Sequence, residues 1–241
     1  MPLPTIATPI YELVLPSNEK KIKFRPFLVK EEKILIIALE SKDVVHITSA
    51  VKQVISDCIL TKEIAVQELP IFDIEYLFLN IRAKAIGESI DLIVTCGDDG
   101  VTKVPVTIYV DEIKVNKVEN HTNKIEINNG YTIQLKYPSL EQFINNNFDL
   151  TNKSSENLEK SSKLISMCID MVYNKEDCWV ASDCTEKEIL DWIDTLSPKD
   201  YKKIEKFFKT MPKLSHEIKV MNPETQVENT LVLEGLSDFF A

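Results

Sequence analysis

Residues 90–110 read IDLIVTCGDDGVTKVPVTIYV, two apolar runs that flank the turn Gly97-Asp98-Asp99-Gly100. Glycine supplies the positive φ angles that a tight turn needs, and β-branched residues favour extended strands. The stretch therefore predicts a β-hairpin, with strands over Ile90 to Cys96 and Val101 to Val110.

Two further hairpins are predicted on either side of this one. Downstream, Asn128-Asn129-Gly130 separates strands predicted over Lys124 to Ile127 and Tyr131 to Tyr137, and Asn-Gly between strands is a strong hairpin signal. Near the start of the chain, Tyr11 to Leu15 and Ile22 to Phe27 are predicted as paired strands, because a polar turn separates them.

Helical periodicity marks the segments that precede residue 90. Val29 to Glu40 is predicted as a helix whose inner face carries Ile34, Leu35, Ala38 and Leu39. A second helix should begin near Asp43, and a third is predicted from Asp73 through Ala85, closed by Gly87. Because helices and strands are grouped rather than alternating, the predicted fold class is α+β.

The last third of the chain is predicted to be mainly helical. Glu156 to Tyr173 has helical periodicity, Thr185 to Glu188 reads as a capping box, and Ser197-Pro198 is typical of a helix start. A β-hairpin is predicted from His216 to Leu233, with its turn at Asn222-Pro223-Glu224-Thr225. This hairpin would close the C-terminal part of the chain.

A domain boundary is predicted in a polar, Asn- and Ser-rich segment. Asn145-Asn146-Asn147 and Thr151 to Ser155 have the composition of a loop or linker. We therefore expect an N-terminal α+β domain of mixed β-hairpins and helices over residues 1–150. The second expected domain, over residues 151–241, is helical and ends in the β-hairpin and a short helix.

Composition limits the kinds of partner. The chain has 241 residues, 44% of them hydrophobic, which is enough for a substantial core. A formal net charge of −10 argues against nucleic acid, because phosphate binding needs clustered Lys and Arg. The apolar runs are too short to span a bilayer, and Met1 to Thr5 shows no export signal. We expect no nucleic-acid partner, no membrane partner and a cytosolic location.

Metal and cofactor chemistry is not expected. The chain contains five cysteines, without the paired spacing of a structural zinc site, at positions Cys58, Cys96, Cys168, Cys178 and Cys184. In a cytosolic chain an odd set of this kind is predicted to stay reduced. The histidines His46, His121 and His216 are isolated, and no nucleophile elbow, HExxH helix or phosphate-binding loop is present.

Asp98 and Asp99 are the best candidates for catalysis. Adjacent carboxylates can hold a divalent ion, so a small metal-dependent hydrolase or nucleotide-processing enzyme is the alternative function. Asp beside Gly is also ordinary turn chemistry, which favours a structural role. Divalent-ion titration with thermal melting separates the two interpretations.

Two apolar stretches are candidates for partner binding. Leu69 to Leu79 carries Phe72, Tyr76 and Phe78, more apolar mass than one helical stripe would bury against a small sheet. It is either a central core helix or a helix shared with a partner, since aromatic clusters anchor protein interfaces. At the C-terminus, helical spacing predicts an apolar anchor made of Leu236, Phe239 and Phe240.

Several of these stretches also carry a resemblance to a known family. Lys21 to Phe27 followed by Lys30 to Lys33, Leu69 to Lys84, and the apolar C-terminal ending resemble the baseplate hub subunits and hub-assembly proteins of T-even-type contractile-tailed phages. Some members look like zinc ribbons in the last hairpin, with a cysteine knuckle at its turn. This chain has no cysteine between Asn222 and Thr225, so we expect a metal-free hairpin.

The resemblance implies a non-enzymatic protein of phage tail morphogenesis that binds other baseplate hub or tail proteins. It would act in the host cytoplasm, either as a hub subunit that stays in the virion baseplate or as a chaperone. A chaperone would cover the apolar surface of a hub partner until the next subunit docks. A host-directed adaptor with no place in tail assembly is a further alternative, which the genomic neighbourhood would separate from the first.

Overall fold

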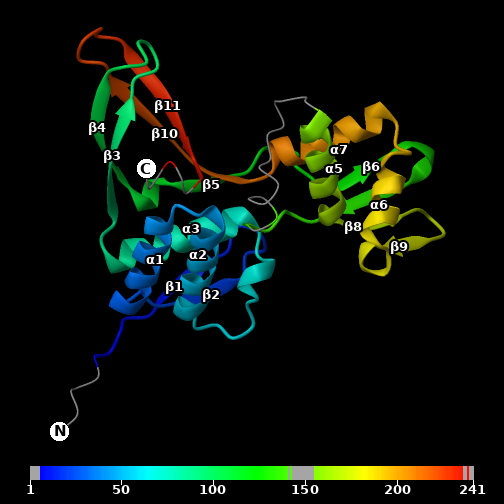
Figure 1. The fold of residues 1–241 in the computed structure, drawn as a ribbon, viewed down its shortest axis with the longest axis horizontal. Helices are drawn as coiled ribbons and strands as arrows, with labels where there is room; N and C mark the ends of the chain where they lie inside the picture. The colour runs from blue at the N-terminus through cyan, green and yellow to red at the C-terminus, as the bar shows by residue number, and fades with distance from the viewer. Residues whose placement is uncertain (1–5, 141, 143–154, 236–237, 239–241) are drawn as a thin grey trace. The chain divides into compact units, whose positions relative to one another are not determined.

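The computed structural model describes residues 6–140, 142, 155–235 and 238, with only the backbone described for Val44 and for residues 155–158. The chain divides into two compact units. Unit 1 comprises residues 1–116 and 213–241, and unit 2 comprises residues 117–212. In sequence, unit 2 is therefore an insertion between two segments that fold together as unit 1 (Figure 1).

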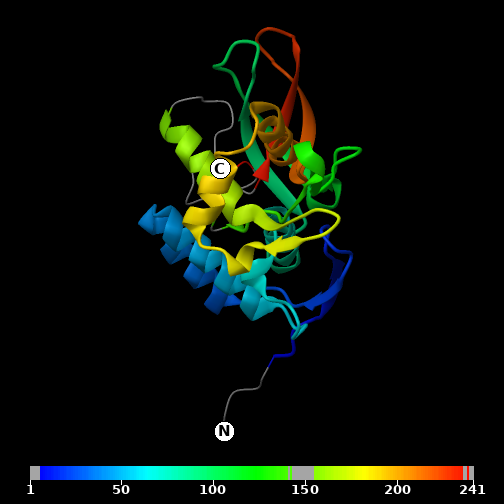
Figure 2. The same ribbon diagram turned by 90° about the vertical axis from the view of Figure 1, so that its right-hand side faces the viewer.

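Unit 1 begins with a β-hairpin followed by a layer of helices. These elements are β1 (Tyr11–Val14), β2 (Lys21–Phe24), α1 (Val29–Ser41), α2 (Val44–Cys58), η1 (Val66–Glu68) and α3 (Ile71–Ala85). Helix α2 packs against both α1 and α3, so α1 lies at the edge of the layer (Figures 1 and 2). An isolated β-bridge between Phe24 and Ile59 attaches the hairpin to the end of α2.

The rest of unit 1 is built from antiparallel strands. These elements are β3 (Ser89–Thr95), β4 (Lys103–Tyr109), η2 (Val110–Glu112), β5 (Lys114–Asn116), β10 (Lys213–Met221) and β11 (Glu228–Glu234). Strand β3 pairs with β4, while β10 pairs with both β11 and β5. Leu79 and Ala83 of α3 share one core with inward residues of both hairpins, among them Ile90, Leu92, Ile218 and Leu233.

Unit 2 is a sheet packed with helices. Its elements are β6 (Lys124–Glu126), η3 (Asn128–Gly130), β7 (Thr132–Leu135), α5 (Ser155–Cys168), β8 (Ile169–Tyr173), β9 (Cys178–Val180), η4 (Ala181–Asp183), α6 (Glu186–Ile193) and α7 (Pro198–Thr210). The strands pair antiparallel in the order β6, β7, β8, β9. The core joins strand residues such as Ile133 and Leu135 with Ile204, Phe207 and Phe208 of α7.

The predicted α+β class is confirmed, but the layout within it differs from the expected one. The predicted boundary between residues 150 and 151 falls inside unit 2, because β7 precedes it, β8 follows it and the two strands pair. The closing hairpin belongs to unit 1 rather than to the helical segment, because β10 pairs with β5. Sequence proximity to the last helices therefore does not decide where this hairpin folds.

Two helix boundaries also differ from the expected ones. The helix predicted through Tyr173 ends at Cys168, and the following residues form β8. Helix α3 begins at Ile71, with Pro70 as its N-cap, so that Asp73 lies in the first turn. The buried Asp73 carboxylate instead accepts hydrogen bonds from the backbone N–H of Ser17, at 3.1 Å, and from the Ser17 hydroxyl.

Candidate protein-binding site

The aromatic residues predicted on α3 lie largely in the core of unit 1. Phe72 and Phe78 are buried, while Tyr76 is partly buried and packs against the core shared by α3 and the hairpins. Helix α3 thus packs in the core of unit 1, and partner binding through Phe72, Tyr76 and Phe78 stays a prediction. The other predicted anchor residues, Leu236, Phe239 and Phe240, lie outside the described residues.

Asp98 and Asp99 meet the turn of the last hairpin. The side-chain amide of Asn222 donates to Oδ1 of Asp98 at 3.0 Å and to Oδ2 of Asp99 at 3.0 Å. The hydroxyl of Thr225 also donates to Asp98. In return, the backbone N–H of Asp98 donates to Oδ1 of Asn229 at 2.9 Å. We call this group of contacts the turn clasp.

The turn clasp gives both carboxylates a structural role. Hydrogen bonds from Asn222 and Thr225 lower the pKa of Asp98. Hydrogen bonds from Thr102 and from the backbone at Val101 lower the pKa of Asp99. The carboxylates are thus held ionised as acceptors that join two turns. Within the described part of the chain, no cluster of three or more His, Cys, Asp or Glu residues could hold a metal ion.

The remaining candidates for chemistry are divided between core and surface. Cys58, Cys96 and Cys168 are buried, whereas Cys178 and Cys184 are exposed. Burial raises the pKa of Cys58 to about 11 and that of Cys168 to about 12, so neither thiol is poised as a nucleophile. These buried thiols are core residues of their units.

His121 is partly buried in unit 2, where it packs against an aromatic residue of the core. Its ring stacks on Tyr137 and Phe207, with ring centroids 5.7 Å and 5.1 Å away. Nδ1 lies 2.9 Å from the Thr210 hydroxyl, and Nε2 lies 3.0 Å from the Tyr137 hydroxyl. Burial lowers the pKa of His121, which favours the neutral ring.

An apolar cavity lies in unit 2, in a region where no binding site was predicted from the sequence. We call it the aromatic cavity. It has a volume of about 400 Å³ and is lined by Tyr131, Ile169, Val172, Trp179, Cys184, Glu188, Ile189 and Trp192. Both tryptophans of the chain are among these residues.

Local pairing explains how these aromatic side chains come together. On β9, Trp179 is directly opposite Val172 of β8, and its ring centroid lies 6.0 Å from that of Tyr131. Trp192 and Ile189 are three residues apart on α6, so they share one face of that helix. Strand β9 and helix α6 therefore both contribute side chains to the aromatic cavity.

A capping box fixes where α6 begins. The backbone N–H of Thr185 donates to Oε2 of Glu188 at 2.8 Å, and the backbone N–H of Glu188 donates to the Thr185 hydroxyl at 3.3 Å. These bonds with Thr185 lower the pKa of Glu188, so the rim of the aromatic cavity carries a firmly held negative charge. The capping box was predicted from the sequence and is confirmed.

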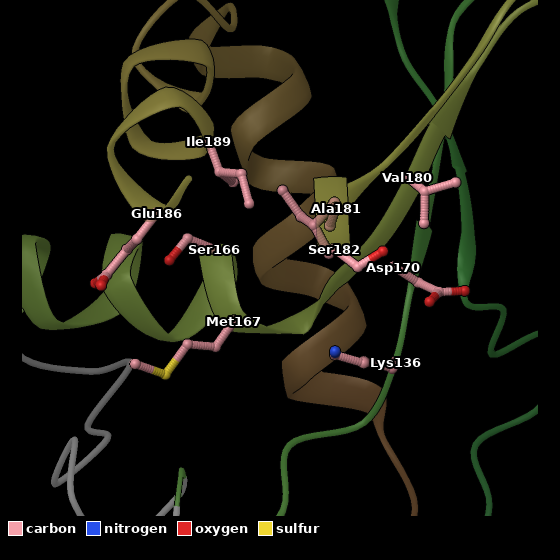
Figure 3. Close-up of a pocket in the computed structure, with 10 residues that line it drawn as sticks. Lys136, Ser166, Met167, Asp170, Val180, Ala181, Ser182, Glu186 and Ile189 are labelled. Carbon is pink, nitrogen blue, oxygen red and sulfur yellow. The ribbon is translucent and has the colours of Figure 1, made fainter. Parts of the chain in front are cut away.

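A second, more polar cavity adjoins the first, and the two share Ile169 and Ile189. We call it the polar cavity; its volume is about 310 Å³. Figure 3 shows Ser166, Met167 and Glu186 on one side of it and Lys136 and Asp170 on the other. The neighbouring cavities could seat an apolar side chain and polar side chains of one bound segment.

Comparison with known proteins identifies the family. Residues 8–241 match the model of a family described as T4 bacteriophage base plate protein. The chain is thus a phage baseplate protein. It belongs to the T4 bacteriophage base plate protein family, which confirms the predicted resemblance at the level of the baseplate. Neither the curated proteins nor the solved structures gave a match.

Family membership implies contact with other phage baseplate proteins and a place in the virion tail. It also suggests a structural rather than an enzymatic role. Among the described residues, no helix is both long and apolar enough to cross a membrane.

Proposed function

We propose that this protein acts in building the baseplate hub, as a hub subunit or as a hub-assembly chaperone, by binding other baseplate proteins. Membership of the baseplate family supports the setting. The hub assignment follows from the resemblance of residues 21–33, of residues 69–84 and of the C-terminal ending to hub proteins.

The observation that carries the proposal is the aromatic cavity. Trp179 is 46% exposed at its edge, although tryptophan has a large apolar surface that water solvates poorly. Tryptophan and tyrosine are enriched among the residues that dominate binding energy at protein interfaces. A partner side chain that fills the cavity would remove Tyr131, Trp179 and Trp192 from water together, so the site is suited to anchoring a protein segment.

Charge around the cavities indicates the chemistry of that segment. Glu188 lies at the rim of the aromatic cavity, and Glu186 and Asp170 line the polar cavity with Lys136. The chain as a whole carries a formal net charge of −10. Complementary charges speed encounter and select partners, so we expect an apolar residue flanked by Lys or Arg to be bound.

The proposed action is stoichiometric binding rather than catalysis. By seating an apolar segment of a hub partner, the protein would keep that segment from water and from incorrect contacts. Binding that favours the folded partner stabilises it by mass action. A hub-assembly chaperone would release the segment when the next subunit docks, whereas a hub subunit would keep it.

A cavity variant tests the proposal. Tagged protein carrying Trp179→Ala should capture less of its baseplate partner from phage-infected cells than the unaltered protein does. Tyr109→Ala is the matched control, because Tyr109 is an exposed aromatic residue on β4 of unit 1, outside the cavity. Equal capture by all three proteins, each shown to be folded by circular dichroism, would show that the aromatic cavity does not bind the partner.

A further inference from the structure

Helix α1 carries apolar side chains on its solvent-exposed face. Val29, Ile36, Ile37 and Leu39 have exposed fractions between 49% and 68%. Leu39 was predicted on the inner face, but the structure places it on the surface. A helix that is apolar on its outer as well as its inner face is typical of an interface.

The orientation of α1 is fixed by a buried charge. Glu31 is fully buried, and its carboxylate accepts hydrogen bonds from Nη2 of Arg25 at 2.8 Å and from the backbone N–H of Leu28 at 2.9 Å. Ala38 follows Glu31 after two helical turns and is also buried. The helix therefore cannot rotate to bury Ile36 or Ile37 without breaking this ion pair.

The charges beside the exposed isoleucines are arranged symmetrically with opposite signs. Lys33 precedes Ile36 by three residues, and Glu40 follows Ile37 by three residues. Lys33 and Glu40 are both exposed. Positions three apart are neighbours on a helix surface, so the row reads cation, isoleucine, isoleucine, anion.

We propose that two copies of this chain associate through α1, with the two helices antiparallel about a twofold axis between Ile36 and Ile37. In this register, Ile36 of each copy meets Ile37 of the other, and Lys33 of each copy faces Glu40 of the other. A twofold contact requires a self-complementary surface, and this row of side chains is self-complementary in both shape and charge.

This association lies beyond the proposed function, because it uses α1 of unit 1 and does not depend on the cavities of unit 2 or on a hub partner. One helix face buries less area than a standard stable interface of about 800 Å² per partner, so the dimer is weak and concentration-dependent. Clustering of copies at the site of assembly would favour it by mass action.

Sedimentation velocity of the full chain from about 5 μM to about 200 μM tests the association, since this range brackets a micromolar dissociation constant. A shift from monomer to dimer with rising concentration is expected. Ile36→Glu should abolish that shift, because it introduces charges at the centre of the contact. The matched control is Ile93→Glu on β3, since Ile93 is 71% exposed and lies off α1.

Charge exchange tests the antiparallel register. Lys33→Glu alone and Glu40→Lys alone should each weaken the dimer about tenfold, because like charges then face each other at two symmetric positions. The double variant, Lys33→Glu with Glu40→Lys, should restore it. A monomer at every concentration, a dimer that survives Ile36→Glu, or single reversals that the double variant does not rescue would each overturn the proposal.

Discussion

The side-chain amide of Asn222 lies 3.0 Å from Oδ1 of Asp98, although the two residues are 124 positions apart in the sequence. This contact joins the tip of the β3–β4 hairpin to the tip of the β10–β11 hairpin. Unit 2 lies between these hairpins in the sequence. The turn clasp therefore holds together two segments of unit 1 that the insertion of unit 2 separates along the chain.

Loss of the turn clasp should destabilise unit 1. Asn222→Ala removes a fully buried amide that donates to both Asp98 and Asp99. The free energy of unfolding should therefore fall by about 1 to 3 kcal/mol. Urea unfolding followed by circular dichroism measures the loss. The control is Asn116→Ala, whose hydrogen bond to Ser215 is exposed and should contribute little. Equal stability of the two variants would count against the turn clasp.

The ion pair between Glu31 and Arg25 should stabilise the fold more than the neighbouring charge of Glu32 does. Glu31→Ala leaves Arg25 without its buried partner, so we expect a loss of about 3 kcal/mol in the free energy of unfolding. Glu32→Ala, one position along α1, should change stability by less than about 0.5 kcal/mol. If the two losses were similar in urea unfolding, the ion pair would not be what orients α1.

Glu31 also predicts a response to acid. Burial disfavours its charge, but hydrogen bonds from Arg25 and Leu28 outweigh burial and lower its pKa to about 2. The folded-state pKa is below the unfolded value, so the ionised Glu31 carboxylate stabilises the fold. Its contribution to the free energy of unfolding is complete above pH of about 4.3 and disappears as pH falls toward about 2. The stability lost over this range should be smaller in Glu31→Ala than in the unaltered protein.

His121 predicts a second pH dependence, at higher pH. Burial lowers its pKa, so the folded chain binds a proton at this ring less readily than the unfolded chain. The contribution of the neutral His121 ring to the free energy of unfolding is complete above the unfolded-state pKa of about 6.5. It declines as pH falls below that value. Tryptophan fluorescence reports on unit 2 alone, because Trp179 and Trp192 both lie there.

The comparison for this prediction is between two histidine variants. His121→Phe should reduce the change in melting temperature between about pH 7.5 and about pH 5.5, since the titrating ring is gone. His46→Gln should leave that change as it is, because His46 is exposed on α2. An unaltered pH response in His121→Phe would show that another group is responsible.

Thiol labelling should distinguish the wall of the aromatic cavity from the nearby surface. Cys178 and Cys184 are exposed and should react quickly with a maleimide, while the buried thiols react only on unfolding. Cys184 lines the aromatic cavity, so a bulky label there should block partner binding in a Cys178→Ser background. The same label on Cys178 in a Cys184→Ser background should leave binding intact. Equal effects at both positions would argue against binding in the cavity.

Local signals in the sequence predicted local structure well. Asn128-Asn129-Gly130 marks a hairpin because Asn129 and Gly130 adopt positive φ angles of 63° and 76°. Thr185 with Glu188, and Ser197 with Pro198, mark helix starts because capping acts within a few residues. The helix predicted over Ile169–Tyr173 is wrong, because the pairing of this strand with β7 depends on residues more than thirty positions away.

The candidate sites were missed for the same reason. Tyr131, Trp179 and Trp192 meet only because β7, β8 and β9 pair and α6 packs beside them. Asp98 and Asn222 were each recognised as turn residues, but nothing in their separate stretches shows that the turns touch. Composition and spacing therefore predict the elements, while sites made from distant elements require the tertiary structure.

The most direct test of the proposed hub function is affinity purification of the tagged protein from phage-infected cells, paired with mass spectrometry of purified phage particles. We expect baseplate hub proteins to co-purify with the tagged chain. Its presence in particles would identify a hub subunit, and its absence from them a chaperone. Recovery of no baseplate hub protein with the tagged chain, when the tag leaves phage growth unchanged, would contradict the account.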